Sequence, residues 1–474
     1  MLLIVFYLTT RFINLTLLPV FNDEAIYIDW GQKMLGGGGF FFSLFDGKQP
    51  FLMWIFGVFA NIFPDPLFGG RFVSVIFGLF TLLGIYKIGS IFFEKRTAFL
   101  ASLIYILSPL FLFYDRQALM ESAVSAIGVW IFYFGVQFAK LKDLRTAIYL
   151  GLLFGIGFFI KTNIIAFFFS FLILYFIFER KLNRIFFLIF VTSFLILIPL
   201  FFQKDFLKIF ELNSRFSFTF SELFRFPVGS WLINLVSVLN IALFQTFGLL
   251  LIFALIPFRT IKKNKELKII FLWTGVLLVF YILTVRTSNP RYLVSFLPLL
   301  TIPIAKGLFS LEFKFRTLIF VVFLLPFIFL NIEQIFNTSN YFDTLSRFTK
   351  YSQKNVYMEG FTSGFMVKEA ADYVADELGG NKGIVGVRLD AGNPENSVSM
   401  YLSKKENIKR VFLDSKIVSL PQNQNYINSN VPIYFISRDE HLAGLEKFFI
   451  LKKKFIKPDG ISSIGVYQLR TKGN

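Results

Sequence analysis

The chain has 474 residues, of which 55% are hydrophobic and 69 are phenylalanine, which excludes an ordinary water-soluble globular protein because such a surface requires lipid. Its formal net charge of +18 would suit nucleic acid, but the basic residues are spread over short loops between apolar stretches, which argues against that partner. The chain contains no cysteine, so disulfides and thiolate chemistry are excluded.

Apolar stretches recur from the N-terminus to about residue 330. A helix needs about 17 to 25 residues to cross a hydrocarbon core of about 30 Å. We therefore predict an all-α polytopic membrane protein with about 11 transmembrane helices. The first span is interrupted by a charged residue, Arg11. The predicted spans are residues 1–20, 70–92, 97–113, 122–139, 147–160, 164–178, 185–202, 231–257, 269–285, 292–309 and 317–331.

Short basic loops separate these spans at every second connection. Positively charged loops of this kind are typical of the cytoplasmic side. The pattern predicts a multi-pass protein of the cytoplasmic (plasma) membrane, with its N-terminus inside and its C-terminal part outside. The five basic loops are residues 93–96, 139–145, 179–184, 259–268 and 312–316.

The segment after the first span, residues 21–69, is predicted to lie outside. Its apolar stretch 50–63 is too short to cross and is expected to lie in the membrane interface. Asp23 and Glu24 stand where the first span ends. They can be the first turn of a helix capped by Asn22, with acids facing the positive end of the dipole, and this does not exclude a catalytic role.

Further charged side chains stand at the outer ends of the spans, where charge is costly, at about 2.5 to 3.5 kcal/mol per residue on insertion scales. Outside loops have no topological reason to hold lysine or arginine, so these cations favour an anionic ligand such as a lipid phosphate. The alternative for each is contact with lipid headgroups. The cations are Lys48, Arg71, Arg116, Lys161, Arg286 and Arg291, and the carboxylate Glu121 follows five residues after Arg116.

Residues 332–474 are polar and mixed, and are predicted to form a soluble extracytoplasmic α/β domain after a membrane domain of residues 1–331. A second outside segment, 203–230, is long for a simple connector. Helices are expected at 366–380 and around 394–403, and strands at 382–389, 431–437, 448–455 and 462–470.

Six motifs in chain order resemble the GT-C superfamily of lipid-linked glycosyltransferases, specifically the protein O-mannosyltransferase and aminoarabinose transferase group. The resemblance covers about residues 5–310. It departs from the family pattern at Gln49, where the family has proline, and at Glu121, where aspartate is commoner. The motifs are FNDEAIYIDWGQKML (21–35), DGKQPFLMW (46–54), GGRFVSVIFGL (69–79), the Arg116 to Glu121 spacing, GFFIKTN (157–163) and PRYLVSFLPLL (290–300).

The resemblance implies transfer of one sugar, with inversion, from a polyprenyl-phosphate carrier to an acceptor hydroxyl of a protein, lipid or glycan. A hydroxyl is a weak acid, so a carboxylate must take its proton, and Asp23 is the expected base, with Glu24 orienting it or the acceptor. Glu121 is expected to hold Arg116 or to contact the sugar. The expected donor-binding residues are Lys48, Arg71, Arg116, Glu121, Lys161, Arg291 and Tyr292.

Two other classes of function are open at this point. A transporter or flippase of lipid-linked sugars would favour charges at the bilayer midplane and inverted repeats, and only Arg11 fits that pattern. A non-catalytic scaffold would leave the Asp23–Glu24 loop unexplained. The sequence indicates no obligatory cofactor, and the participation of a divalent metal is left open.

Overall fold

A computed structural model describes residues 1–179, 181, 183–258, 264–389, 392–414, 431–438 and 448–470. Within these ranges the chain divides into two compact units. The first unit holds residues 1–15, 39–52 and 71–352, and the second holds residues 16–38, 53–70 and 353–474. The predicted first outer segment, 21–69, therefore contributes to both. Residues 259–263, half of the predicted basic loop 259–268, lie outside the described residues.

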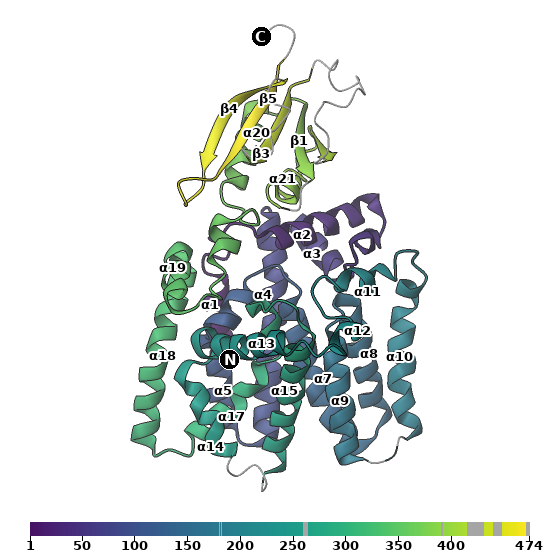
Figure 1. Ribbon diagram of the computed structural model, residues 1–474, viewed down its shortest axis with the longest axis vertical. Helices are drawn as coiled ribbons and strands as arrows, with labels where there is room; N and C mark the ends of the chain where they lie inside the picture. Colours follow the sequence, from purple (N-terminus) through teal and green to yellow (C-terminus); the bar gives the residue numbers. More distant parts are fainter. Residues whose placement is uncertain are drawn as a thin grey trace. The chain divides into compact units, whose positions relative to one another are not determined.

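Long apolar helices dominate the first unit (Figure 1). Six helices of the described part are long and apolar enough to span a membrane, and a seventh span results if a bent helix pair is counted as one. These numbers rest on length and composition, so the predicted number of about 11 stays a prediction. The six are α4 (Pro66–Phe92), α7 (Glu121–Leu141), α10 (Arg184–Phe201), α13 with its π-helical end (Val228–Thr246), α15 (Lys265–Thr284) and α18 (Phe313–Phe336).

The bent pair consists of α5 (Lys95–Leu107) and α6 (Pro109–Asp115), whose axes differ by 68°. The break follows from proline, which lacks an N–H donor and disfavours helical geometry in the residue before it. Ser108 accordingly has an extended backbone, with φ −71° and ψ 122°. The predicted span 97–113 is thus a broken helix.

Shorter apolar helices match the remaining predicted spans. The helix α1 (Leu2–Phe12) has only 11 residues, so the first predicted span, 1–20, is wrong in length. Its chain turns soon afterwards, where Asn14 takes a positive φ of 50°. The other matches are α8 (Leu144–Ile160), α9 (Ile164–Phe178) and η5 with α17 (Pro298–Leu308). The helices η4 and α14 (Gly248–Phe258) form the second part of the predicted span 231–257, and α3 (Phe51–Ile62) is the apolar stretch 50–63 that was predicted to lie in the interface.

Short helices connect these elements within the described ranges. They are η1 (Met34–Gly38), η2 (Phe42–Asp46), α11 (Lys208–Asn213), α12 (Phe220–Leu223), η3 (Ala242–Thr246), α16 (Pro290–Leu293), α19 (Thr338–Phe348) and η6 (Asn355–Glu359).

A five-stranded mixed sheet lies in the second unit, with strand order β2-β1-β3-β5-β4. The strand β1 pairs parallel with β2 and β3, while β5 pairs antiparallel with β3 and β4. The edge strand β4 carries Lys452, Lys453 and Lys454, and charged edge residues discourage pairing with other chains. The strands are β1 (Gly383–Leu389), β2 (Ile408–Asp414), β3 (Ile433–Arg438), β4 (Phe449–Ile456) and β5 (Ser463–Leu469).

Two helices accompany the sheet, α20 (Val367–Leu378) and α21 (Glu395–Tyr401). The buried face of α20 packs against β3 and β5 through a core that includes Val367, Ala371 and Val374. The helix ends at Gly379, which takes the left-handed conformation that favours glycine. The predicted C-terminal α/β organisation is therefore confirmed, and β2 is an additional strand that the sequence analysis did not find.

The second unit also contains α2 (Asn22–Lys33), which begins with the predicted acid pair. Its Gly31 lies against the backbone of Met53 and Gly57 in α3, where a Cβ on Gly31 would come within 2.1 Å of the Met53 carbonyl oxygen. Only glycine allows this approach. The contact fixes α2 against α3 at Met53 and Gly57.

Candidate active site

Two cationic side chains from separate parts of the first unit bind the same carboxylate. Glu121 Oε1 accepts hydrogen bonds from Lys161 Nζ at 2.6 Å and from Arg291 Nε at 2.9 Å. The Tyr292 ring lies beside both cations, with its centroid 5.2 Å from Lys161 Nζ and 5.8 Å from Arg291 Cζ. We call these four residues the Glu121 cluster. The structure thus brings together four of the residues that the sequence analysis selected.

Local sequence places each member at the end of a helix. Glu121 opens α7, where a negative charge is favoured by the helix dipole. Lys161 is the extended residue that ends α8. Arg291 lies in α16, which starts at Pro290 and is capped by the Asn289 side chain through a 3.0 Å bond to the Arg291 N–H. The charged residues of the cluster therefore lie at or next to helix termini.

Burial makes the Glu121 cluster electrostatically strong. The side chain of Glu121 is 2% exposed, that of Arg291 12% and that of Lys161 22%. Two cations thus bind one oxygen of a single carboxylate. The second carboxylate oxygen, Oε2, is buried and has no hydrogen-bond partner among the described residues. Such an arrangement is suited to binding an anion whose oxygens approach the two cations.

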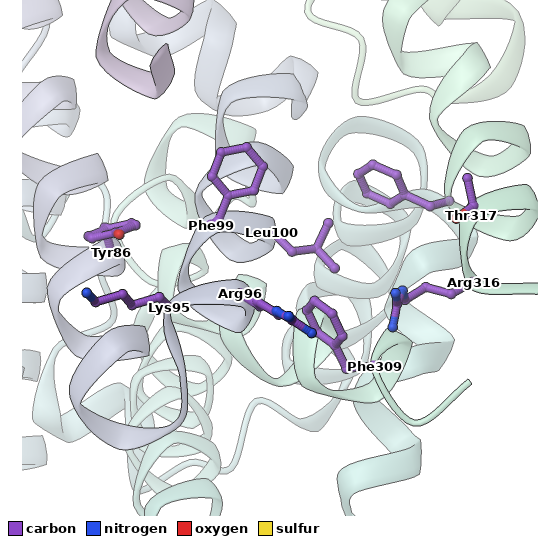
Figure 2. Close-up of a pocket in the computed structure, with 9 residues that line it drawn as sticks. Tyr86, Lys95, Arg96, Phe99, Leu100, Phe309, Arg316 and Thr317 are labelled. Atoms are coloured by element: carbon purple, nitrogen blue, oxygen red, sulfur yellow. The ribbon is translucent and has the colours of Figure 1, made fainter. Parts of the chain in front are cut away.

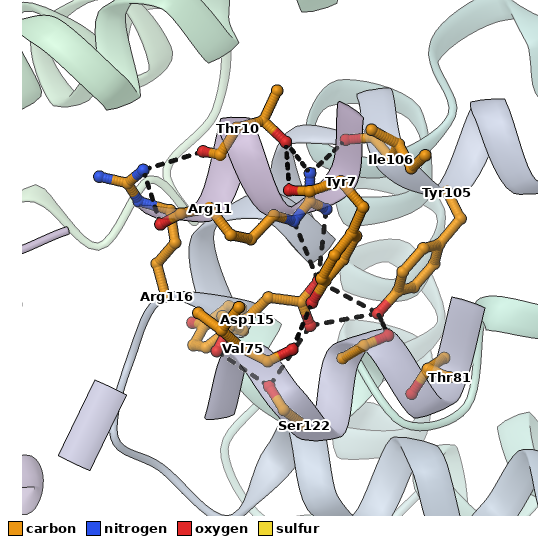
Figure 3. Close-up of polar contacts among 12 residues, drawn as sticks. Tyr7, Thr10, Arg11, Val75, Thr81, Tyr105, Ile106, Asp115, Arg116 and Ser122 are labelled. Carbon is orange, nitrogen blue, oxygen red and sulfur yellow. Dashed lines mark hydrogen bonds and ion pairs between the residues drawn. The ribbon is translucent and has the colours of Figure 1, made fainter. Parts of the chain in front are cut away.

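A second buried group explains the charge in the first predicted span (Figure 3). Asp115 accepts hydrogen bonds from Arg11 Nε and Nη2, both at 3.3 Å, and from Tyr105 Oη at 3.1 Å. Arg11 and Asp115 are almost fully buried, at 0% and 1% exposure. Removing either partner would leave an uncompensated buried charge. Arg11 is therefore part of an internal ion pair.

Arg71 and Arg116 hold the chain that follows α1. Arg116 donates to the carbonyl oxygens of Ile13 and Asn14 at 2.8 Å each, and Arg71 Nη1 donates to that of Leu15 at 2.8 Å. Both arginines are buried. The expected contact of Glu121 with Arg116 is not what the structure shows, because Glu121 bonds to Lys161 and Arg291 while Arg116 bonds to backbone.

The remaining outer cations serve other contacts. Lys48 forms an ion pair with Asp46, and Arg215 Nη1 lies 3.9 Å from the same carboxylate. Arg286 bonds to both oxygens of Glu222, at 2.7 and 2.6 Å, and to the Ser214 carbonyl at 2.8 Å. This hydrogen bonding with Arg286 lowers the pKa of Glu222 to about 2. Arg286 therefore holds in place the segment 203–230, which was predicted to lie outside.

The acid pair in the second unit has two distinct environments. Glu24 is fully buried, and its Oε2 accepts a 2.9 Å bond from the N–H of Phe21, which is the N-cap of α2 in place of the expected Asn22. Asp23 is only half-buried. The strand-like contact of Phe21 with Ser363 and the bond from Asn22 N–H to the Thr362 carbonyl fix this helix start. Glu24 is thus a structural cap, and Asp23 is the more accessible carboxylate.

Sequence reasoning missed the acid that anchors α2. Asp29 is fully buried and accepts bonds from Lys33 Nζ at 2.6 Å, Asn396 Nδ2 at 2.7 Å and Ser399 Oγ at 2.6 Å. The last two residues belong to α21, so a carboxylate fixes α2 to the C-terminal part of its unit. The sequence offered little signal, because Gln32 and Lys33 follow on the same helical face and make Asp29 look like part of a polar surface.

We expect Asp29→Ala to loosen α2, because it leaves the buried donors of Asn396 and Ser399 unsatisfied at about 1–3 kcal/mol each. Hydrogen exchange of the α2 amides should accelerate, and the thermal midpoint should fall. The exposed acid Asp376 in α20 provides the control, because Asp376→Ala should change neither. Unaltered exchange in α2 of the Asp29 variant would contradict the anchoring role.

Comparisons with known proteins bear on the same residues. A sequence model of the family described as dolichyl-phosphate-mannose-protein mannosyltransferase matches residues 47–202. That range contains Glu121 and Lys161, and it leaves out Asp23 and Arg291. No curated protein matches the chain by sequence.

Several solved structures share the fold. ArnT from Cupriavidus metallidurans bound to undecaprenyl phosphate is 14% identical, with a TM-score of 0.61 over 98% of this chain and 97% of ArnT. The apo form of the same ArnT is 15% identical to this chain, with a TM-score of 0.62 over 98% of this chain and 97% of ArnT. The Archaeoglobus fulgidus oligosaccharyltransferase in complex with zinc and sulfate is 14% identical, with a TM-score of 0.56 over 98% of this chain and 73% of that one. The chain thus has the GT-C fold of multi-pass membrane proteins, as its motifs predicted.

Proposed function

We propose that the protein is an integral membrane glycosyltransferase that moves a single sugar from a polyprenyl-phosphate carrier to an acceptor hydroxyl, with inversion. The observation that carries this proposal is the Glu121 cluster, in which Lys161 and Arg291 meet at a buried carboxylate, in a chain that shares the fold of ArnT, which was solved with undecaprenyl phosphate bound. The two cations of the cluster suit a phosphate, and the ligand in the ArnT structure is a lipid-linked phosphate.

The donor's leaving group is a phosphate ester that departs as an anion, so it needs cations and no general acid. Lys161 and Arg291 are the proposed phosphate contacts, because a lysine point charge and an arginine fork stabilise developing negative charge. Glu121 sets their positions, and Tyr292 lies against both cations. Hydrogen bonds hold the cations in place before the donor arrives, which lowers the cost of organising them.

Lys48, Arg71 and Arg116 are proposed as further contacts of the donor phosphate or sugar. The two arginines are held by backbone carbonyls, so their geometry is fixed independently of the donor. Asp23 is the proposed general base that takes the proton of the acceptor hydroxyl. Glu24 supports it by fixing the start of α2.

Lys161→Ala should weaken binding of the carrier, because it removes one of the two cations proposed to contact the phosphate. We expect the apparent dissociation constant for undecaprenyl phosphate to rise by about tenfold or more, the loss of a charge-assisted hydrogen bond. Lys204→Ala, at an exposed lysine of the second outer segment, is the control. An unchanged affinity in the Lys161 variant would count against a phosphate contact.

The protein is proposed to lie in the cytoplasmic membrane with its C-terminal part outside. Because the chain has no cysteine, single cysteines can report this directly. A cysteine at Asp376 should react with an impermeant thiol reagent on intact cells, and a cysteine at Arg145 should react only after lysis. The opposite result would invert the proposed orientation.

A turnover assay separates transfer from transport. Purified protein is mixed with radiolabelled lipid-linked sugars and with an envelope extract from cells that lack the gene, which supplies the acceptor, and both the donor and the labelled acceptor are analysed. A transferase cleaves the bond between sugar and phosphate and releases free carrier phosphate, whereas a flippase or scaffold leaves the donor intact. Mass analysis of surface glycans after gene deletion then identifies the sugar and the class of acceptor.

A further inference from the structure

A cavity of about 460 Å³ lies in the first unit, where α4 and α5 meet the end of α17 and the start of α18, and it shares no residue with the Glu121 cluster. Figure 2 shows the guanidinium groups of Arg96 and Arg316 on either side of the Phe309 ring. The lining residues are Tyr86, Lys95, Arg96, Phe99, Leu100, Phe309, Arg316, Thr317 and Phe320.

The charge of this cavity is unbalanced. In the part of the chain that the structure describes, no acidic side chain lies within 4.0 Å of Lys95, Arg96 or Arg316. Neighbouring basic residues behave differently, since Lys306 pairs with Glu94 at 3.7 Å. Arg316 instead lies over the Phe309 ring, with its Cζ 4.5 Å from the centroid. Arg96 and Arg316 therefore face the same apolar ring, Lys95 lies beside Tyr86, and none of the three has an acidic partner within 4.0 Å among the described residues.

The two loops that supply these cations were both predicted to be cytoplasmic. Residues 93–96 and 312–316 are far apart in sequence, yet the structure brings them to the same cavity. This agrees with their assignment to one membrane side. Anionic lipids are concentrated in the cytoplasmic leaflet, where they attract lysine and arginine near the surface.

The neighbouring helix surfaces offer room for acyl chains. Only 22% of the 18-residue apolar stretch of α18 is buried inside the protein. Phe80 of α4 and Leu318 and Val321 of α18 are exposed apolar residues on the helices that line the cavity. A lipid whose phosphate binds the cations can lay its chains along these surfaces.

We propose that this cavity binds the headgroup of an anionic phospholipid of the cytoplasmic leaflet. The phosphate bonds to Arg96 and Arg316, Lys95 adds charge, and Phe99, Leu100 and Phe320 contact the glycerol and the first methylenes. The lipid stabilises the contact of α18 with α5. This site is separate from the proposed donor site, and its occupant is not consumed.

The test measures lipid retention by the full-length protein in nanodiscs with equal phosphatidylglycerol and phosphatidylcholine, using native mass spectrometry after release. The wild type should retain phosphatidylglycerol selectively. R96A/R316A should lose that selectivity by about 30-fold, the effect of two basic contacts near a charged surface. R96K/R316K should keep most of it and shows that charge matters. The control R145A/R184A, at exposed arginines elsewhere, should match the wild type.

Competing ligands decide between sources of the phosphate. Inorganic phosphate at millimolar concentration should not displace phosphatidylglycerol, and undecaprenyl phosphate should not compete at this site. Equal retention by wild type and R96A/R316A, or displacement by either competitor, would overturn the proposal. The experiment does not measure donor turnover. Loss of the lipid-site proposal would therefore not bear on the proposed transferase activity, and loss of the transferase proposal would not bear on the lipid site.

Discussion

Asp23→Asn should reduce sugar transfer by about 10²–10⁴-fold, the usual contribution of a general base. The substitution keeps the size of the side chain and removes its ability to accept the hydroxyl proton. Asp23 is half-buried at the start of α2, whereas the adjacent Glu24 caps the helix, so loss of the Asp23 charge should leave the fold intact. Single-turnover rates with saturating donor measure the chemical step.

The control for this variant is Asp376→Asn, an equal change at an exposed acid of the same unit. Expression level, membrane insertion and carrier binding should match the wild type in both variants. Raising the pH should not restore transfer in Asp23→Asn, because the amide cannot act as a base. Full activity of Asp23→Asn would remove this residue as the base.

Glu121→Gln should destabilise the protein by about 3 kcal/mol, the lower end of the cost of removing one partner of a buried ion pair. Lys161 is partly exposed, which is why the lower end applies. Lys161 and Arg291 would then lie side by side without the charge of Glu121. Thermal unfolding in detergent measures the loss, and Glu211→Gln, at an exposed acid, is the control that should show none.

The carrier should partly reverse this loss. If its phosphate binds the two cations, undecaprenyl phosphate supplies the negative charge that Glu121→Gln lacks. The thermal midpoint of the variant should therefore rise more on carrier addition than that of the wild type. An equal rise in both proteins would place the phosphate elsewhere.

Periodicity and charge predicted the architecture well, because membrane helices form their backbone hydrogen bonds internally and are recognisable as long apolar stretches. The first span was wrong in length for a physical reason. Arg11 looked like an interruption, but it pairs with Asp115, which is distant in sequence. An acid and a base at membrane depth, each without a local partner, indicate such a pair, although one sequence cannot say which residues meet.

The C-terminal region shows a different limit. The strand β2 contains Ile408–Asp414, a run with basic residues that resembles a polar turn when taken alone. It becomes a strand because β1 supplies a parallel partner over its whole length. Parallel pairing depends on a non-local neighbour, so local pattern does not reveal it.

The candidate site was predictable by residue type but not by pairing. The cations Lys161 and Arg291 were chosen because outside loops rarely need them, and the structure places both at Glu121. The expectation that Glu121 would hold Arg116 rested on a spacing of five residues within one segment. The actual partners come from α8 and α16, and only tertiary packing determines such contacts.

The most direct test of the account is an experimental structure of the protein with undecaprenyl phosphate bound. We predict phosphate oxygens within hydrogen-bond distance of Lys161 and Arg291, with the Asp23 carboxylate facing the same water-filled space. A phosphate bound away from both cations, or Asp23 on the other side of the membrane from them, would contradict the proposed enzyme.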